Sequence, residues 1–137
     1  MTVGLILLAG GKGERFGASK PKQFMSLRGR PVIDYSLEVL EPYMDQVVVV
    51  SPYPYKDYEH ADPCLTRSQS VRNGLELIET EFVVVHESVR PHITKDQIEE
   101  FLAALPQSDS VSTAVPIIDG YLERLGSHFI PSSKEGR

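Results

Sequence analysis

Three short apolar runs, each ending at a turn, constrain the fold of this 137-residue chain more than any other feature. They are Val3–Leu8, 46–51 and 82–86. A continuous apolar run of about four to eight residues is typical of a strand buried on both faces, and such strands are usually parallel. The chain therefore predicts at least three central strands of a mostly parallel sheet.

Segments with helical periodicity lie between and after these strands. We expect helices over 31–40, 68–79 and 94–105, and a fourth strand over 111–115. Thr94 and Gln97 have the spacing of a capping box, which marks the start of the third helix. The inward-facing residues should be Val71, Leu75 and Ile78 in the second helix and Ile98, Phe101, Leu102 and Leu105 in the third.

Strands alternate with helices, which indicates an α/β domain with right-handed crossovers and a parallel sheet. Because a domain typically has about 100 to 200 residues, we expect residues 1–137 to form a single domain. Ligands of such sheets bind beyond the carboxyl ends of the strands. The loops 9–22, 87–93 and 116–120 follow three strands of this sheet and are therefore expected to converge.

Composition narrows the function classes. Fourteen Lys and Arg against nineteen Asp and Glu give a net charge of −5, which argues against a general nucleic-acid-binding surface. No apolar stretch approaches the roughly 20 residues that span a bilayer, and the amino terminus lacks the pattern of a signal peptide. Because Cys64 is the only cysteine, an internal disulfide is excluded and the cytoplasm is the expected compartment.

The glycine-rich loop after the first strand is a local exception to the negative charge. It has glycine at three of the four positions 10–13, and glycines let backbone amides approach phosphate oxygens. Residues 10–22 carry four Lys or Arg residues and one Glu, a local charge of +3. The spacing fits neither the P-loop nor the dinucleotide fingerprint. We interpret the loop as a phosphate-binding loop; the alternative is an ordinary turn with solvated lysines.

Four blocks occur in order along the chain. They are LAGGKGERF at 8–16 followed by KPKQF at 20–24, TRSQSVRNGL at 66–75, VHESVRP at 85–91 and, more weakly, VPIID at 115–119. Together they resemble the sugar-phosphate cytidylyltransferases, and most of all the 2-C-methyl-D-erythritol 4-phosphate cytidylyltransferase family. The resemblance implies a three-layer nucleotide-diphospho-sugar-transferase-like fold. It also implies a reaction that joins CTP to the sugar phosphate and releases pyrophosphate, in non-mevalonate isoprenoid biosynthesis.

The resemblance also implies individual roles. Arg15 and Lys22 would be the catalytic cations that stabilise the pentavalent phosphorus. Nucleotide contacts would come from Ala9, Gly10, Gly11, Lys12, Gly13, Ser70 and Ser88. Acceptor contacts would come from Glu87, Arg90 and Asp119, with Glu87 also near a Mg²⁺ ion that phosphates mainly hold. His86 ends a predicted buried strand and is for that reason expected to be structural, whereas a homodimer is implied by the family alone.

The chain departs from the family pattern at three places, of which the largest is at its carboxyl end. Glu87 stands where the family usually has aspartate, so its carboxylate reaches one methylene further. Pro63 and Cys64 stand where the family commonly has two glycines near the base, which is expected to alter base recognition. The preceding connection, 52–62, is short, and a small strand is expected to be missing there.

The carboxyl-terminal region is expected to begin a projecting β-arm near 117–137, with strands over 121–125 and 129–131. Family members continue beyond this arm, so we expect a fold that is incomplete at its carboxyl end. Two explanations stay open, a fragment or a naturally short relative. Two other functions also stay open: ribitol-5-phosphate cytidylyltransferase, whose branch shares the 10–11 and 88–89 pairs, and a nucleotide-binding module without turnover.

Overall fold

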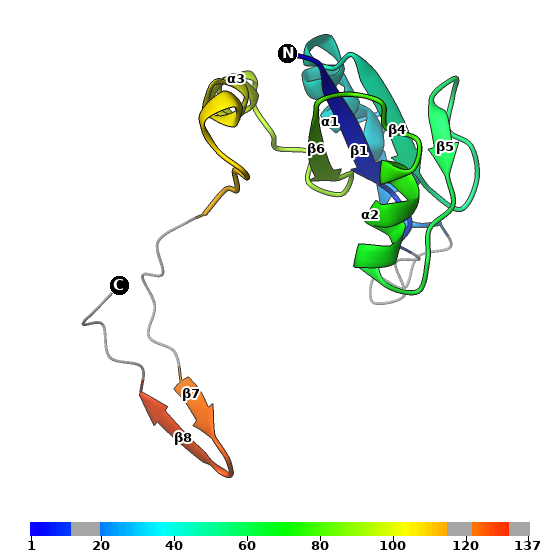
Figure 1. The fold of residues 1–137 in the computed structure, drawn as a ribbon. Helices are drawn as coiled ribbons and strands as arrows, with labels where there is room; N and C mark the ends of the chain where they lie inside the picture. The colour runs from blue at the N-terminus through cyan, green and yellow to red at the C-terminus, as the bar shows by residue number, and fades with distance from the viewer. Residues whose placement is uncertain (12–19, 115–121, 132–137) are drawn as a thin grey trace.

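A parallel sheet forms the centre of the computed structural model, which describes residues 1–11, 20–114 and 122–131 (Figure 1). The strand order is β5-β4-β1-β6. The strands are β1 (Val3–Leu8), β4 (Gln46–Val50), β5 (Glu59–Ala61) and β6 (Phe82–Glu87), and every pairing between them is parallel. All three strands that the apolar runs predict are present. β1 has a neighbouring strand on each side, and all six of its residues are buried because both of its faces are covered.

Helices cover both faces of this sheet, so the three-layer α/β prediction is confirmed. They are α1 (Val32–Leu40), α2 (Arg67–Leu75) and α3 (Lys95–Ala104). Figure 1 shows α1 and α2 on opposite sides of the sheet. The core cluster on the α1 and α3 side includes Leu5, Leu7, Ile33, Leu37, Val49 and Ile98, and the cluster on the α2 side includes Ile6, Leu8, Val48, Val50 and Ala61.

Gly74 explains how closely α2 packs on the sheet. A Cβ atom at this position would lie 2.9 Å from Cγ2 of Ile6 and 3.2 Å from Cγ2 of Val50. These distances are shorter than ordinary carbon–carbon contacts of about 3.5–4.0 Å. Glycine therefore allows the helix backbone to rest directly on the side chains of β1 and β4.

Two predictions about the sheet are wrong. Residues 111–114 are not in a strand, and 112–114 are exposed, while Val115 lies outside the described residues. A short strand, β5, lies instead within the 52–62 connection, where we expected one to be missing. Its three residues, Glu59, His60 and Ala61, show no apolar run, and only Ala61 is buried. The strand forms because β4 offers a free edge, which the local pattern does not reveal.

The second helix ends earlier than predicted. Leu75 is its last residue and is 44% exposed, so its predicted inward orientation is wrong. Val71 does pack against the core, and Ile78 reaches the same cluster from the turn after the helix. The third helix follows the prediction, because both hydrogen bonds of its capping box are present.

Short elements complete the described structure. They are the 3-10 helices η2 (Lys22–Phe24), η3 (Glu41–Tyr43) and η4 (Leu105–Gln107), and the antiparallel pairs β2 (Ser26–Leu27) with β3 (Arg30–Pro31) and β7 (Leu122–Leu125) with β8 (His128–Pro131). β7 and β8 occupy the region in which we expect the arm. Within the described ranges, no helix combines the length and the apolar character needed to cross a membrane.

Candidate nucleotide site at the carboxyl edge of the sheet

The first and second predicted loops leave the sheet side by side. Leu8 and Glu87, the last residues of β1 and β6, are register partners. The Ser88 amide donates a hydrogen bond to the Leu8 carbonyl (3.0 Å), and the Ala9 amide donates to the Val50 carbonyl (2.8 Å). The starts of the 9–22 and 87–93 loops therefore lie side by side, as expected, while 116–120 lies outside the described residues.

The described residues hold only part of the predicted site. Four predicted site residues lie outside them: Lys12, Gly13, Arg15 and Asp119. Lys22 is exposed at the first position of η2. Its neighbour Gln23 is buried and contacts the backbone of the glycine loop, a link that was not predicted from the sequence.

Gly10 lies against Pro63, so the connection before α2 closes one side of the glycine loop. A Cβ atom at Gly10 would lie 2.5 Å from Cβ of Pro63, whereas one at Gly11 would meet nothing within 4 Å. Pro63 is a departure from the family pattern, but its contact with the loop was not predicted. Pro63 therefore occupies the space that a side chain at position 10 would need.

The start of α2 is organised by side-chain hydrogen bonds. Thr66 caps the helix by accepting from the Gln69 amide. The buried Ser70 hydroxyl donates to the Thr66 carbonyl (3.1 Å) and accepts from the Cys64 amide (2.9 Å). These bonds hold the segment that carries Pro63, so Ser70 has a structural role here, and its contact with the base stays a prediction.

Glu87 forms an ion pair with Arg67. The Arg67 Nε donates to Glu87 Oε1 at 2.5 Å, and the Glu87 side chain is 29% exposed. Arg67 is the first residue of α2, while Glu87 is the last residue of β6. This ion pair fixes one oxygen of the carboxylate, and among the described residues Oε2 has no hydrogen-bond partner. The pairing of these two residues was not predicted from the sequence.

Ser88 carries an unsatisfied polar atom. The residue is 1% exposed, and its Oγ has no hydrogen-bond partner among the described residues. A buried hydroxyl without a partner costs about 1–3 kcal/mol, and such a group in a native structure calls for an explanation. Contact with a ligand at the glycine loop is one, since the Ser88 amide is bonded to the end of β1.

His86 fastens the loop after β6 to α1. Its Nε2 lies 3.1 Å from the hydroxyl of the fully buried Ser36 and 3.1 Å from the Arg90 carbonyl. Burial lowers the pKa of His86 below its usual value of 6.5, although the Arg90 carbonyl opposes this effect. The imidazole is therefore neutral near pH 7, and the geometry agrees with the predicted structural role.

We expect His86 to make stability depend on pH. Its folded-state pKa is lowered, so its contribution is fully present above pH 6.5 and is lost as the pH falls through the folded-state pKa. His86→Gln should therefore weaken the fall in the urea midpoint between pH 7.5 and pH 5. His92→Gln, at an exposed position, is the matched control. An unchanged pH dependence in His86→Gln would show that the buried imidazole does not titrate differently on folding.

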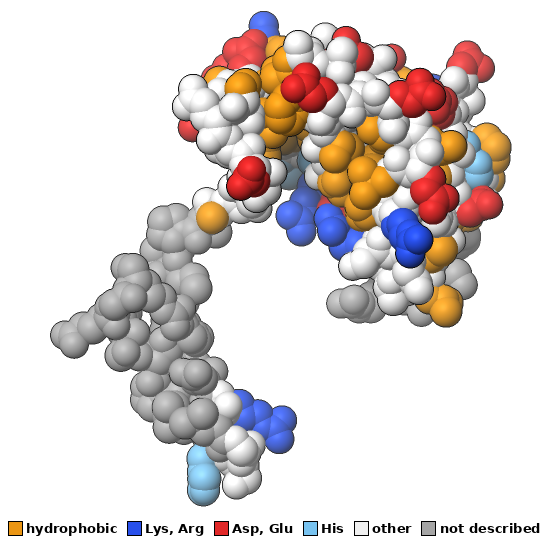
Figure 2. Space-filling view, viewed as in Figure 1, with side chains coloured by type: hydrophobic (Ala, Val, Ile, Leu, Met, Phe, Trp, Pro, Cys, Tyr) orange, Lys and Arg blue, Asp and Glu red, His pale blue; other side chains and the backbone are white. Residues whose placement is uncertain are grey.

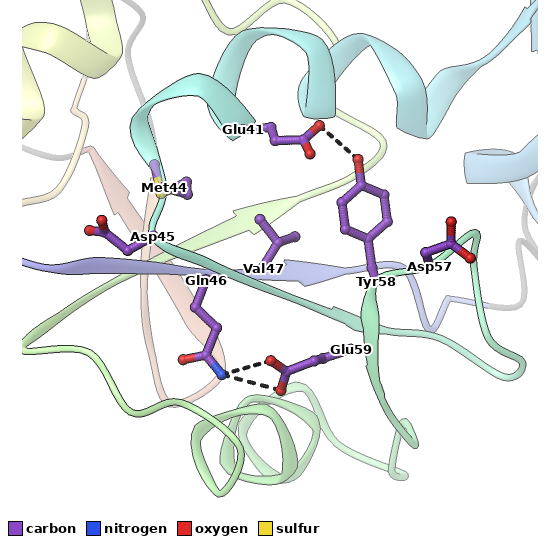
Figure 3. A pocket seen from close by; sticks show the side chains of 8 residues that line it. All are labelled: Glu41, Met44, Asp45, Gln46, Val47, Asp57, Tyr58 and Glu59. Atoms are coloured by element: carbon purple, nitrogen blue, oxygen red, sulfur yellow. Dashed lines mark hydrogen bonds between the residues drawn. The ribbon is translucent and has the colours of Figure 1, made fainter.

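A cavity of about 310 Å³ lies at the opposite ends of the strands, where β4 and β5 begin (Figure 3). Its lining includes four carboxylates: Glu41, Asp45, Asp57 and Glu59. Tyr58 points at Glu41, and burial, followed by this hydrogen bond, raises the pKa of Tyr58 to about 12. In the part of the chain that the structure describes, no three His, Cys, Asp or Glu residues are placed to hold a metal. The negative charge makes this cavity unsuited to a nucleotide.

Known proteins match most of the chain. The IspD family model, described as 2-C-methyl-D-erythritol 4-phosphate cytidylyltransferase, matches residues 3–125. Curated relatives with the same description include one from Chlamydia abortus, 37% identical over 79% of this chain and 54% of its own length. Another, from Caldicellulosiruptor saccharolyticus, is 35% identical over 86% of this chain and 63% of its own length. The chain thus spans a little more than half the length of these relatives.

Solved structures agree with this match. The bifunctional IspDF of Campylobacter jejuni superposes with a TM-score of 0.81 and 26% identity, covering 97% of this chain and 40% of its own. The 2-C-methyl-D-erythritol 4-phosphate cytidylyltransferase of Thermus thermophilus superposes with a TM-score of 0.76 at 24% identity, covering 96% of this chain and 64% of its own. The second likeness shows the fold alone.

Proposed function

The chain belongs to the 2-C-methyl-D-erythritol 4-phosphate cytidylyltransferase family, and on that premise we propose that it transfers the cytidylyl group of CTP to 2-C-methyl-D-erythritol 4-phosphate. The products are 4-diphosphocytidyl-2-C-methyl-D-erythritol and pyrophosphate, in non-mevalonate isoprenoid biosynthesis. The observation that carries this proposal is the juxtaposition of the glycine loop, 9–11, with the 87–90 segment at the carboxyl edge of β1 and β6.

The reaction depends on the positioning of its substrates and on positive charge more than on a covalent nucleophile. A phosphate oxygen of the acceptor attacks the α-phosphorus of CTP, and the bond from that phosphorus to the pyrophosphate oxygen breaks. Negative charge then spreads over phosphate oxygens in the transition state. Cations that the protein already holds in position when the reaction begins stabilise this charge. We assign that role to Arg15, because a guanidinium can bind two oxygens at once, and to Lys22, whose ammonium is a compact charge.

The nucleotide contacts follow the glycine loop. We propose that the backbone of Ala9 and Gly10 meets the cytosine and that residues 11–13 wrap the phosphates. Ser70 would lie near the base. The buried, unpartnered hydroxyl supports a nucleotide contact for Ser88, because binding would give that oxygen a partner.

Acceptor contacts are assigned to the end of β6, to the segment after it and to one later residue. We propose that Arg90 binds the acceptor phosphate, and that Glu87 and Asp119 bind acceptor hydroxyls. Arg67 holds one oxygen of Glu87, so the longer side chain has a defined position despite its extra methylene. The remaining oxygen is available to the acceptor or to a metal ion.

The residues at this edge fit a magnesium ion held mainly by substrate. Glu87 supplies a hard oxygen ligand, and no further carboxylate, histidine or cysteine joins it in a metal-binding group of the described residues. Mg²⁺ typically keeps several waters and binds one or two carboxylates together with phosphates. When bound, the ion would neutralise charge on the phosphates. Glu87 would be the protein residue that holds it.

The assembly and the location of the protein are part of the same proposal. We propose a homodimer, as the family resemblance implies, with the β7–β8 pair as the start of the arm that reaches the partner. A cytoplasmic location is supported by Cys64, an exposed free thiol that a reducing compartment keeps reduced.

Pyrophosphate release tests the proposed activity. The chain, CTP and Mg²⁺ are combined with methylerythritol phosphate or with ribitol 5-phosphate, and CTP binding is measured separately by calorimetry. We expect CTP to bind more tightly than UTP or ATP, and methylerythritol phosphate to support release. Release with ribitol 5-phosphate alone would move the assignment to the other branch. CTP binding without release would indicate a binding module, and no CTP binding would defeat the proposal.

A further inference from the structure

Gln23 is a buried polar residue whose side chain is devoted to the glycine loop. It is 2% exposed, which is rare for a glutamine. Its Nε2 donates two hydrogen bonds, to the Ala9 carbonyl (2.5 Å) and to the Gly11 carbonyl (3.0 Å). Both protons of the amide are therefore used on backbone that is 12 and 14 residues earlier in the chain.

These bonds replace a sheet partner at the point where β1 ends. The Ala9 amide still donates to the Val50 carbonyl of β4, but the Ala9 carbonyl bonds to Gln23 instead of a strand. In a trans peptide unit the carbonyl and the following amide point in opposite directions. Because Gln23 draws the Ala9 carbonyl inward, the Gly10 amide is turned away from Gln23. The side chain thus determines the direction of a loop amide.

Gln23 also connects the loop to the predicted catalytic lysine. It is the middle residue of η2, whose first residue is the exposed Lys22. The two bonds from Gln23 fix η2 relative to Ala9 and Gly11, and so they fix the base of the Lys22 side chain. Their loss would loosen the link between the two groups that we propose to meet the triphosphate.

We propose that Gln23 is a positioning residue for triphosphate binding: its amide clamps the Ala9 and Gly11 carbonyls and thereby sets both the glycine-loop amides and Lys22. The inference rests on the proposed function, because it assigns the clamped loop to the nucleotide. Gln23 touches no reacting atom. Its effect passes through the backbone that it holds.

Gln23→Glu tests the clamp with almost no change in shape. A carboxylate accepts hydrogen bonds only, so at pH 7.5 it would face two carbonyl oxygens with no proton to donate. We expect CTP to bind at least tenfold more weakly than to wild type. A protonated carboxyl regains one donor. The difference in CTP affinity between Gln23→Glu and wild type should therefore become smaller as the pH falls toward 5. Gln107→Glu, an exposed position on η4, carries the same charge change and should bind CTP as wild type does.

Gln23→Met separates the clamp from packing. Methionine fills a similar volume but donates nothing, so CTP affinity should fall as well, with no recovery at low pH. Wild-type affinity in both variants would overturn the proposal. An equal loss in Gln23→Glu at every pH, with the folded fraction falling in parallel, would also overturn it, because it would indicate only a general structural role.

A measurement without nucleotide keeps this inference separate from the proposed function. In ¹H–¹⁵N spectra of the free chain, the side-chain amide protons of Gln23 should exchange slowly. The backbone amide signals of Gly10 and Gly11 should shift in Gln23→Met and stay unchanged in Gln107→Glu. If wild type does not bind CTP, the proposed function is wrong, but these spectra of the free chain still test the clamp. Rapid exchange of the Gln23 amide would disprove the clamp whatever CTP does.

Discussion

Lys22→Ala is expected to lower the rate of cytidylyl transfer by about 10²- to 10³-fold, the range found when a preorganised group that stabilises transition-state charge is removed. Lys22 lies at the start of η2, and Gln23 next to it is fixed to the glycine loop. Its ammonium would contact oxygens whose charge rises during the reaction, so kcat should fall more than the affinity for CTP. Single-turnover pyrophosphate release with saturating CTP and Mg²⁺ measures this rate.

Arg72→Ala is the matched control for charge. Arg72 lies in α2 and is 81% exposed, so its removal changes the net charge equally without touching the proposed site. Its transfer rate should stay close to that of wild type. Equal rates for Lys22→Ala and wild type would remove Lys22 from the catalytic machinery. Equal losses in both variants would indicate a general electrostatic effect of the protein on its substrates.

Local sequence pattern predicted β1, β4 and β6 and missed β5, the short strand at one edge of the sheet. β1 and β4 are apolar because both of their faces are covered, so period and composition identify them. β5 has one buried residue of three, and its backbone pairing with β4 leaves no apolar signature. Residues 111–114 show the reverse case. The predicted strand begins with an apolar residue, but 111–114 pair with no strand in the described part of the chain.

β6 shows a further limit of pattern. Its run of valines predicts a central strand. In the described sheet, however, β6 is at the edge, and Val85 is 36% exposed. Figure 2, in the same view as Figure 1, shows hydrophobic side chains on the face of the molecule where β6 and α2 lie. Strand order depends on long-range pairing, which no window of sequence contains.

The location of the site and the types of its residues could be predicted from the sequence, but the contacts between those residues could not. The carboxyl-edge rule and the glycine loop located it, and the family resemblance supplied the roles. The clamp of Gln23 and the pair of Arg67 with Glu87 join elements that are 12 to 20 residues apart in sequence. Such bonds depend on which side chains the fold brings together, so only the structure reveals them.

Gly10→Ala is expected to lower the free energy of unfolding by about 1–3 kcal/mol, the usual cost of an inserted methyl group in a filled space. The new Cβ would lie 2.5 Å from Cβ of Pro63, and a proline ring cannot rotate away. Neither Gly10 nor Gly11 has a positive φ, so backbone strain does not enter the comparison. Gly11→Ala, with open space around it, should change stability by less than about 0.5 kcal/mol. Urea denaturation of both variants provides the comparison.

The contact also predicts that positions 10 and 63 are coupled. Glycine stands at position 63 in the pattern that the resemblance implies, and a glycine there would leave room for a side chain at position 10. Pro63→Gly removes the obstructing Cβ, so Gly10→Ala should cost less in that background, with a coupling energy of about 0.5–3 kcal/mol. Pro63→Gly alone is destabilising because it increases the entropy of the unfolded chain, and the double-mutant cycle cancels that contribution. Simple additivity of the two substitutions would mean that Pro63 does not limit the space at Gly10. A smaller cost of Gly10→Ala in the Pro63→Gly background would show that Pro63 occupies the space beside Gly10 in the proposed nucleotide loop.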